Sequence, residues 1–350
     1  MSKPLTGRIA FAGALVLVST YLAPAGSAFA EEASNVDSTA AAVAAADPTL
    51  VYESIDLSNL PTEGQQAVGT DDVEITMSED ATDGMILTAE DAIDLQVDLP
   101  FADEAAKAEI STHGLAVFDN ANGSKTVPVP RQDGSVQINT VIVSADAPTE
   151  YTYTFTFSAH EHPEIRNVDG VVLFLDDEEK MLAGMAPAWA KDANGNAVNT
   201  RYEVSDNTVT QIIEHGEGSA YPIVADPWLG IKLWSRITVD SYRSQPRVNL
   251  DLSGWGWAVW SGVAQGGGVA GFAAGQAILN TAGWSEAQGW STTVRNALDK
   301  TSQRQQFECH ALGALFAGQW NLEKFRPNRT THWSFGVAVH HCNWTTANRY

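Results

Sequence analysis

The residues from 151 to 157 alternate strictly between aromatic and threonine side chains, in the order Tyr-Thr-Tyr-Thr-Phe-Thr-Phe. In a β-strand this period of two places the four aromatic rings on one face and the threonine hydroxyls on the other. Shorter runs of similar character recur between residues 94 and 214, separated by turns rich in Asp, Asn and Gly. No long stretch of this region has helical periodicity. The pattern predicts an antiparallel β-sandwich or barrel, and we expect a sandwich over residues 67–227.

The chain changes in composition across residues 220–228, which read Ala-Tyr-Pro-Ile-Val-Ala-Asp-Pro-Trp. Residues 31–228 contain 37 acidic and 7 basic residues, a net charge of −30, whereas the residues after them contain 6 acidic and 11 basic ones, a net charge of +5. Pro222 and Pro227 fix their own φ angles and favour an extended residue before them, so a stiff junction is predicted. We expect two modules, an acidic β-sandwich and then a small, basic, disulfide-closed α+β domain over residues 228–350. Proteolysis at the junction stays open.

The first 30 residues have the features of a secretory signal peptide. Lys3 and Arg8 form a positively charged start, an apolar segment follows, and Ala28-Phe29-Ala30 supplies small residues for cleavage after Ala30. We therefore expect a secreted, extracellular protein. Residues 31–66 are rich in alanine and poor in aromatic residues, so a mostly disordered spacer is predicted there. The overall charge of −23 argues against nucleic acid as a partner of the full chain.

Cys309 and Cys342 are the only cysteines in the chain. Export places them in an oxidising compartment, where a pair of thiols forms a structural disulfide. A catalytic thiol would need a reduced state and an activating base, and His310 points in a different direction from Cys309 if the segment is helical. A disulfide between the two cysteines is therefore the prediction.

Nine tryptophans follow Trp228, and three of them stand close together as Trp255, Trp257 and Trp260. Such density fills a core or supplies stacking surfaces for sugars or bases. Because these three rings cannot all face one core, we predict that some are accessible, and we name them with Arg326 as candidate binding residues. The partners predicted for this surface are a cell-wall polymer or an anionic membrane surface.

Residues 252–285 form a run of 34 residues without a charge. Within it Gly267, Gly271 and Gly275 recur every four positions, a spacing that lets helices approach closely in membranes. Glycine and alanine contribute little apolar area, and glycine weakens a helix, which favours a packed helix or a glycine loop instead. The sequence does not decide between membrane activity of the segment 254–283 and a packed helix or glycine loop.

His310, Asn321 and His332, with Arg326 between the last two, form the one arrangement that resembles a catalytic set. A metal-dependent nuclease uses such residues, the first His activating water and the last holding a cation at the phosphate. The ββα framework of such nucleases is not visible, and three residues of these types occur close together easily by chance. The segment His160-Glu-His162 offers only two metal-binding imidazoles. We therefore expect no metal site and no cofactor, and we do not predict an enzyme.

Further elements of the second module follow from its periodicity. Ser285 is a suitable cap for a helix whose apolar stripe contains Val294 and Leu298. A second helix is predicted over residues 307–316. Residues 333–341 alternate between large and small side chains, so a strand is predicted there.

Two resemblances to secreted actinobacterial proteins rest on short motifs. Residues 115–227 resemble a β-rich module through three of them: Pro187-Ala-Trp-Ala-Lys-Asp-Ala-Asn-Gly195, Thr200-Arg-Tyr202 and Tyr221-Pro-Ile-Val-Ala-Asp-Pro227. Residues 234–343 resemble the actinobacterial domain of unknown function 2599 through five motifs in order: Trp284-Ser-Glu286, Gln306-Phe-Glu-Cys-His310, Trp320-Asn-Leu-Glu323, Arg326-Pro327 and Cys342-Asn343. The chain departs from that pattern at Trp344, where proline is expected, and at Lys324-Phe325, where Pro-Trp is expected. The resemblance implies secretion and a cysteine pair, and it implies no established activity.

The predicted function is that of an extracellular or cell-envelope binding or interaction protein. The alternative is a secreted antibacterial effector, either membrane-active through the glycine-rich segment or acting as a His-Asn-His nuclease. In that alternative the acidic module carries or masks the basic one by charge attraction. It would then cover five basic side chains: Arg295, Arg304, Lys324, Arg326 and Arg329.

Overall fold

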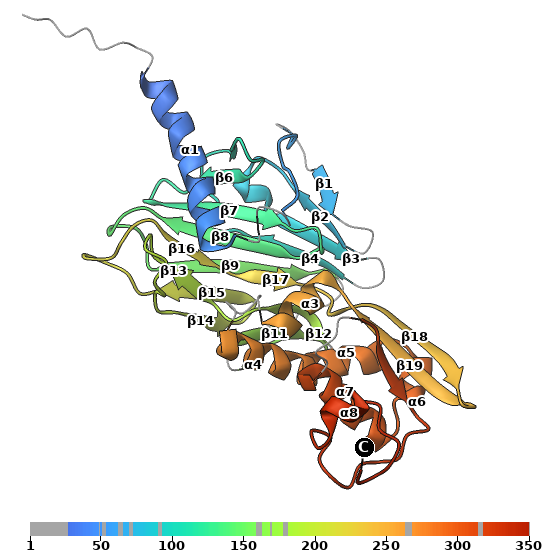
Figure 1. The fold of residues 1–350 in the computed structure, drawn as a ribbon. Helices are drawn as coiled ribbons and strands as arrows, with labels where there is room; N and C mark the ends of the chain where they lie inside the picture. Colours follow the sequence, from blue (N-terminus) through green and yellow to red (C-terminus); the bar gives the residue numbers. More distant parts are fainter. Residues whose placement is uncertain are drawn as a thin grey trace, which may run out of the picture.

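The computed structural model describes residues 27–48, 50, 54–61, 66–69, 73–89, 93–158, 163–168, 170–177, 181–262, 268–313 and 318–349 of the 350-residue chain. In this part of the chain two antiparallel sheets stack on each other, and a smaller domain of helices and three strands packs against one of them (Figure 1). The expected fold class, an antiparallel β-sandwich followed by a disulfide-closed α+β domain, is confirmed.

The first sheet has seven strands in the order β1-β2-β3-β4-β9-β15-β14, and each neighbouring pair is antiparallel. The alternating segment of aromatic residues and threonines is the strand β9, with the two faces predicted for it: its four aromatic rings are buried and its threonines face outward. A short 3₁₀ helix, η1 (Ala81–Asp83), precedes β3. The strands are β1 (Gln66–Gly69), β2 (Val73–Met77), β3 (Met85–Ala89), β4 (Ile93–Asp98), β9 (Glu150–Phe157), β14 (Thr200–Ser205) and β15 (Thr208–Ile213).

The second sheet has ten strands, and its main path runs β10-β11-β12-β17-β8-β7-β6-β5. Strand β16 also pairs with β8, and β13 pairs with β16. The strands are β5 (Glu109–Ile110), β6 (Ala116–Asp119), β7 (Ser124–Pro130), β8 (Val136–Ile142), β10 (Glu164–Val168), β11 (Val171–Leu175), β12 (Met181–Met185), β13 (Trp189–Lys191), β16 (Ile223–Asp226) and β17 (Trp228–Gly230).

One apolar core lies between the two sheets. Side chains of the first sheet, such as Leu87 and Phe155, meet side chains of the second, such as Ile138 and Phe174. The rings of Phe155 and Phe174 lie 4.6 Å apart between their centroids. Inward side chains from both layers meeting in this way make the module a sandwich.

The segment expected to join the two modules is itself part of the second sheet. Strand β16 pairs with one end of β8 and β17 pairs with the other end, and the carbonyl of Pro227 between them accepts a hydrogen bond from Ile138 N at 2.9 Å. Residues 223–231 are all buried. The two prolines therefore stiffen a buried strand pair, and the boundary predicted at residue 228 lies within the sheet.

Helix α1 (Ser27–Ala46) replaces the disordered spacer that the composition predicted for residues 31–66. Its side chains Val36, Ala40 and Val43 pack on valines of the second sheet, among them Val141 and Val224. Spacings of three and four place these small side chains on one helical face. The apolar stripe is narrow and rich in alanine, so it would not stabilise an isolated helix. Packing against the apolar outer face of the sheet stabilises it here.

The C-terminal domain contains a three-stranded antiparallel sheet in the order β18-β19-β20, and the β18–β19 hairpin extends away from the body of the molecule (Figure 1). The strands are β18 (Trp234–Tyr242), β19 (Gln245–Leu252) and β20 (Trp320–Glu323). The helices are α3 (Gly254–Ser261), α4 (Gly268–Ile278), the π-helical turn η3 (Leu279–Gly283), α5 (Trp284–Gly289), α6 (Thr292–Ala297), α7 (Thr301–Gly313) and α8 (Val337–His340).

Two predictions for this domain are corrected by the structure. Ser285 does not cap a helix but lies inside α5, and the helix expected to follow it is divided, because Ser291 begins α6 by accepting a hydrogen bond from Val294 N at 3.2 Å. The strand predicted over residues 333–341 is wrong. That segment forms turns and α8, and positive φ angles at Gly336 and His341 interrupt any extended conformation.

The two modules share a second apolar core. Val171, Leu173 and Leu175 project from β11 toward the C-terminal domain and join a cluster that includes Trp234 and Ile278. The other side chains of β11 face the core of the sandwich. Burial on both faces explains why β11 is a continuous apolar run instead of an alternating one.

Charge attraction does not make this interface as the sequence suggested. The five basic side chains expected to be covered by the acidic module are held within their own domain. Their partners there are Gln288 for Arg295, Glu308 for Arg304, Asp299 for Lys324, Glu323 for Arg326, and the Arg349 carbonyl for Arg329. Apolar burial joins the modules instead.

Candidate functional site

A cleft of about 660 Å³ lies where the two modules meet. The sandwich contributes Asp133 from the turn between β7 and β8, and Trp228 from β17. The C-terminal domain contributes Lys232, which precedes β18, and Trp255 and Trp257 of α3. The cleft is therefore assembled from segments that are far apart in the sequence.

Two glycines permit the close approach of the modules beside the cleft. A Cβ atom on Gly230 would lie 2.5 Å from the ring of Trp255. A Cβ atom on Gly254 would lie 1.9 Å from the Cβ of Asp133. No side chain fits at such distances, so glycine at both positions lets the Trp255 ring and the Asp133 turn take their places.

Ser253 fixes the start of α3 at the edge of the cleft. Its Oγ accepts a hydrogen bond from Gly256 N at 2.8 Å and donates one to Lys232 O at 2.7 Å. The first bond is the N-cap of the helix, and the second ties that helix to the segment before β18. Both bonds hold Trp257, one turn into α3, at the cleft.

Tryptophan rings form the apolar wall of the cleft. Trp228 and Trp255 pack at 5.5 Å between ring centroids, and Trp257 and Trp260 pack edge to face at 5.4 Å. Trp228 is buried and its Nε1 donates to Ser135 Oγ at 2.8 Å, whereas the Nε1 of buried Trp255 has no partner among the described residues. Trp257 and Trp260 are partly exposed. Trp260 does not line the cleft, so the partly exposed ring of Trp257 supplies the stacking surface of this wall.

Asp133 and Lys232 are the charged side chains that line the cleft in the described part of the chain. The Asp133 carboxylate accepts a hydrogen bond from Ser135 N at 2.9 Å, which holds it in the turn. Lys232 is half-buried and makes no ion pair with any described residue. Aromatic surface next to a cation, a carboxylate and serine hydroxyls is suited to a polar ligand with flat apolar patches, such as a sugar ring.

Sequence reasoning named Trp255 and Trp257, which line the cleft, and Trp260, which does not, and it missed Asp133 and Lys232. Asp133 is followed by Gly134, and an Asp-Gly pair is explained by a turn, so the sequence offers no reason to assign Asp133 a binding role. Nothing in the sequence places either residue beside the tryptophans, because the cleft depends on the docking of two modules.

His310, the first member of the catalytic set considered from the sequence, is an internal residue of α7. Its ring stacks on Trp320 at 5.6 Å between centroids, and its Nε2 has no hydrogen-bond partner in the described structure. Burial lowers the pKa of His310 to about 4, against a smaller opposing effect of the Asn321 backbone. The ring is therefore neutral at physiological pH.

The other members of that set have separate partners. The Asn321 amide donates to Asn249 Oδ1 at 3.1 Å across β19 and β20. His332 is bonded through Nδ1 to Ser334 Oγ at 2.8 Å, and none of its contacts is with His310 or Asn321. Of the residues in that set, only Asn321 lies close to His310, and it does so through its backbone.

Arg326, named both as a catalytic and as a binding candidate, is buried and internally paired. It forms an ion pair with Glu323, and its Nη1 donates to the carbonyl of Trp344 at 2.7 Å. Its guanidinium also lies over the ring of Phe325 at 4.7 Å. These contacts give Arg326 the role of fastening the C-terminal segment to β20.

No group of three or more His, Cys, Asp or Glu side chains suited to a metal ion occurs within the described ranges. The segment His160-Glu-His162 lies outside the described residues. Likewise, none of the described helices is both long enough and apolar enough to span a bilayer.

The glycines of the uncharged segment serve helix packing within the domain. Gly271 and Gly275 are buried on α4, whereas Gly267 lies outside the described residues. Gly262 ends α3 with φ of 78°, and a Cβ there would lie 2.4 Å from Phe272 N. The absence of a side chain at Gly262 therefore lets α3 and α4 approach closely in this domain.

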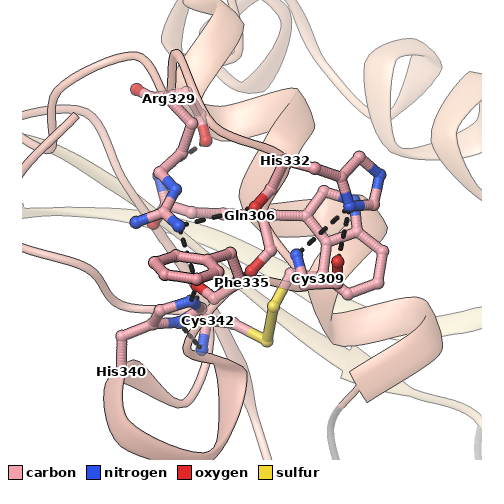
Figure 2. The surroundings of a disulfide bond; sticks show 10 residues. Gln306, Cys309, Arg329, His332, Phe335, His340 and Cys342 are labelled. Carbon is pink, nitrogen blue, oxygen red and sulfur yellow. Dashed lines mark hydrogen bonds between the residues drawn. A yellow bond between two sulfur atoms is a disulfide. The ribbon is translucent and has the colours of Figure 1, made fainter. Parts of the chain in front are cut away.

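The predicted disulfide between Cys309 and Cys342 is confirmed, with 5.5 Å between the Cα atoms. It ties α7 to the segment after α8 (Figure 2). Beside it, His340 Nε2 donates to the carbonyls of Trp333 and Phe335 at 3.0 and 3.2 Å, which leaves Nδ1 to accept from Cys342 N at 3.0 Å. These bonds give the segment its shape in place of strand pairing.

Arg329 holds the same segment from the other side. Its guanidinium donates to the carbonyl of Phe335 at 2.8 Å (Figure 2). It also donates to the carbonyl of Thr331 at 3.2 Å and lies over the ring of Trp344 at 5.2 Å. Sequence reasoning took Arg329 for a surface charge. Its burial at 6 % exposure shows that it organises the C-terminal loop.

Comparison with known proteins adds no family to this description. A scan against protein-family models found no match to the chain, and a search of curated proteins found none either. The resemblance to the actinobacterial domain of unknown function 2599 stays a prediction.

Proposed function

We propose that the protein is an extracellular or cell-envelope binding protein, and that the cleft between its modules holds a sugar unit of a cell-wall polymer. The observation that carries the proposal is the meeting, in one cleft, of the partly exposed ring of Trp257 and the cation of Lys232, which has no ion-pair partner among the described residues. Secretion is part of the proposal. It is supported by the signal-like first 30 residues and by a disulfide, which persists in oxidising compartments.

The chemistry of the cleft favours a sugar that carries an acidic group. An aromatic ring stacks on the apolar face of a pyranose, and the serine hydroxyls that line the cleft pair with its hydroxyl groups. The ammonium of Lys232, with no ion-pair partner among the described residues, attracts a carboxylate or phosphate on the polymer. An acidic glycan of the cell wall combines these properties.

Binding of soluble cell-wall oligosaccharides to the mature chain, measured by calorimetry, tests the proposal. We expect Trp257→Ala to weaken binding at least about tenfold, because losing 1.4 kcal/mol of stacking is a tenfold change in the dissociation constant. Lys232→Gln should weaken binding of acidic oligosaccharides more than neutral ones. The matched control is Trp290→Ala, because Trp290 is partly buried in the C-terminal core and does not line the cleft.

Equal affinity of the wild type and the Trp257→Ala protein would contradict a sugar site in the cleft. The effector alternative is separated by two assays of the mature chain, dye release from anionic vesicles and nicking of plasmid DNA. Activity in either assay without oligosaccharide binding would replace the proposed function by the effector.

A further inference from the structure

Asp226 is a buried carboxyl group at the end of β16. Its side chain is 1 % exposed, and neither Oδ atom has a hydrogen-bond partner among the described residues. Buried polar groups are almost always paired, and an unpaired one costs stability. Asp226 does not line the cleft between the modules, so the proposed function does not account for it.

Charged and titratable groups from several elements act on this carboxyl group. Asp47, which follows α1, and Arg131, which follows β7, lie near it and form an ion pair with each other at 3.6 Å. The phenol groups of Tyr153 on β9 and Tyr202 on β14 are also close enough to interact with it electrostatically. All four surround the side chain inside the sandwich module.

Burial raises the pKa of Asp226 well above its usual value, and the negative charge of Asp47 raises it further. The N–H groups of Trp189 and the positive charge of Arg131 lower the pKa of Asp226 and so offset part of this increase. The Trp189 groups lie near the carboxyl group but form no hydrogen bond of normal geometry with it. The carboxyl group therefore keeps its proton at pH values where an exposed aspartate has lost it.

The peptide bond after Asp226 has two features that favour its cleavage. Its nitrogen belongs to Pro227, and the tertiary amide nitrogen of proline accepts a proton and departs more readily than that of an ordinary peptide bond. Its carbonyl oxygen accepts a hydrogen bond from the Tyr202 hydroxyl at 3.3 Å, a donor placed to stabilise negative charge on that oxygen.

We propose that the folded protein cleaves its own chain between Asp226 and Pro227. A side-chain oxygen of Asp226 attacks the main-chain carbonyl carbon of the same residue, which is always within reach of a five-membered ring. The carboxyl proton passes to the nitrogen of Pro227, and the C–N bond breaks. The products are a cyclic anhydride at residue 226 and a free secondary amine at Pro227. One water molecule then opens the anhydride to two carboxylic acids, so the net reaction is hydrolysis of one peptide bond.

The two products remain associated after this reaction. Residues of β16 and β17 pair separately with β8, and Pro227 O accepts from Ile138 N. The core shared by β11 and the C-terminal domain also lies across the cut. Self-cleavage therefore converts one chain into a non-covalent pair, and it frees the C-terminal domain for release when the sheet opens.

The chain supplies an internal control for this reaction, because it contains one other Asp-Pro bond, Asp47–Pro48. Folded mature protein is kept at pH 5–6 and then separated on a denaturing gel and weighed by mass spectrometry. We expect one fragment that ends at Asp226 and one that begins at Pro227, with Asp47–Pro48 intact. The same protein in concentrated urea at the same pH should show cleavage at neither bond on this time scale.

Variants and a trapping reagent complete the test. Asp226→Asn should abolish the fragments, and Tyr202→Phe should slow their formation at least about tenfold, the loss expected for one donor to a developing oxyanion. Hydroxylamine, a small nucleophile, should capture the anhydride and yield a heavier N-terminal fragment even where water enters slowly. An intact chain both with and without hydroxylamine, equal cleavage at Asp47–Pro48, or fragments from Asp226→Asn would each overturn the proposal.

Discussion

At the scale of single residues, burial decides the charge state of His310. Its folded-state pKa of about 4 lies below the usual 6.5, so between these values the unfolded chain binds a proton that the folded chain does not. The free energy of unfolding therefore falls as the pH drops through this window, by about 3 kcal/mol in total. Urea unfolding between pH 7 and pH 4 measures this slope.

The variant His310→Phe keeps a flat ring on Trp320 and cannot take up the proton. We expect its unfolding free energy to lose the part of the pH slope that His310 causes. His332→Phe is the control, because His332 is exposed and bonded to a neighbouring serine. An unchanged slope in His310→Phe would show that the imidazole does not remain neutral when the protein folds.

Asp226 has the opposite linkage. Its raised pKa means that the folded chain holds a proton which the unfolded chain releases near its ordinary value, so this contribution to stability is present at low pH and is lost as the pH rises. Asp226→Asn replaces the neutral acid by a neutral amide. We expect the variant to be more stable than the wild type at pH 8, by about 1 kcal/mol or more, with a smaller difference at pH 5. Thermal unfolding at both pH values checks this, and a larger gain at pH 5 than at pH 8 would contradict it.

At the scale of elements, the sequence predicted those whose pattern is local. The period of two in β9 and the apolar run of β11 identify strands without any knowledge of their neighbours. Helix α1 could not be predicted, because its alanine-rich stripe becomes sufficient only against the valines of the second sheet. The alternation over residues 333–341 led to a wrong prediction of a strand. Hydrogen bonds from Arg329 and His340 to main-chain carbonyls determine the conformation of that segment instead.

The disulfide is an element of the C-terminal loop, and its removal should loosen that loop first. Closing a loop with a sequence separation of 33 residues contributes about 3.5–4 kcal/mol in the chain-entropy description. We expect the double variant Cys309→Ala, Cys342→Ala to lose stability of that order. Hydrogen exchange should accelerate after Arg326 and stay unchanged in β9. Equal acceleration in both places would mean that the bridge stabilises the whole molecule.

Gly230 tests how closely β17 and α3 must approach. A methyl group there meets the Trp255 ring at 2.5 Å, so the buried indole has to shift to make room for it. We expect Gly230→Ala to cost about 1–3 kcal/mol of stability and to weaken oligosaccharide binding, because Trp255 shifts at the cleft. Gly216→Ala is the matched control, since an added Cβ there meets nothing within 4 Å. Similar stability of the two variants would contradict the tight contact.

At the scale of the whole molecule, the candidate site was accessible to sequence reasoning only in part. The crowding of Trp255, Trp257 and Trp260 predicts that the rings do not share one core, which is a local inference. That Asp133 lies beside them depends on the contact between the β7–β8 turn and α3, which no local pattern encodes. The same holds for Asp226, whose burial results from packing of α1, β7, β9 and β14 around the strand junction.

The shared core predicts how the molecule unfolds. Leu173 of β11 is buried against the C-terminal domain, while Leu87 of β3 is buried between the two sheets of the sandwich. Because one strand belongs to both cores, we expect a single cooperative transition in which tryptophan fluorescence and far-ultraviolet circular dichroism change together. Ten of the eleven tryptophans lie at or after residue 228, so fluorescence reports mainly on the C-terminal domain. Leu173→Ala and Leu87→Ala should each lower the unfolding free energy by about 2–5 kcal/mol and move both probes by the same amount. If Leu87→Ala moved the circular dichroism transition and left the fluorescence transition in place, the two modules would be independent folding units joined only by the chain.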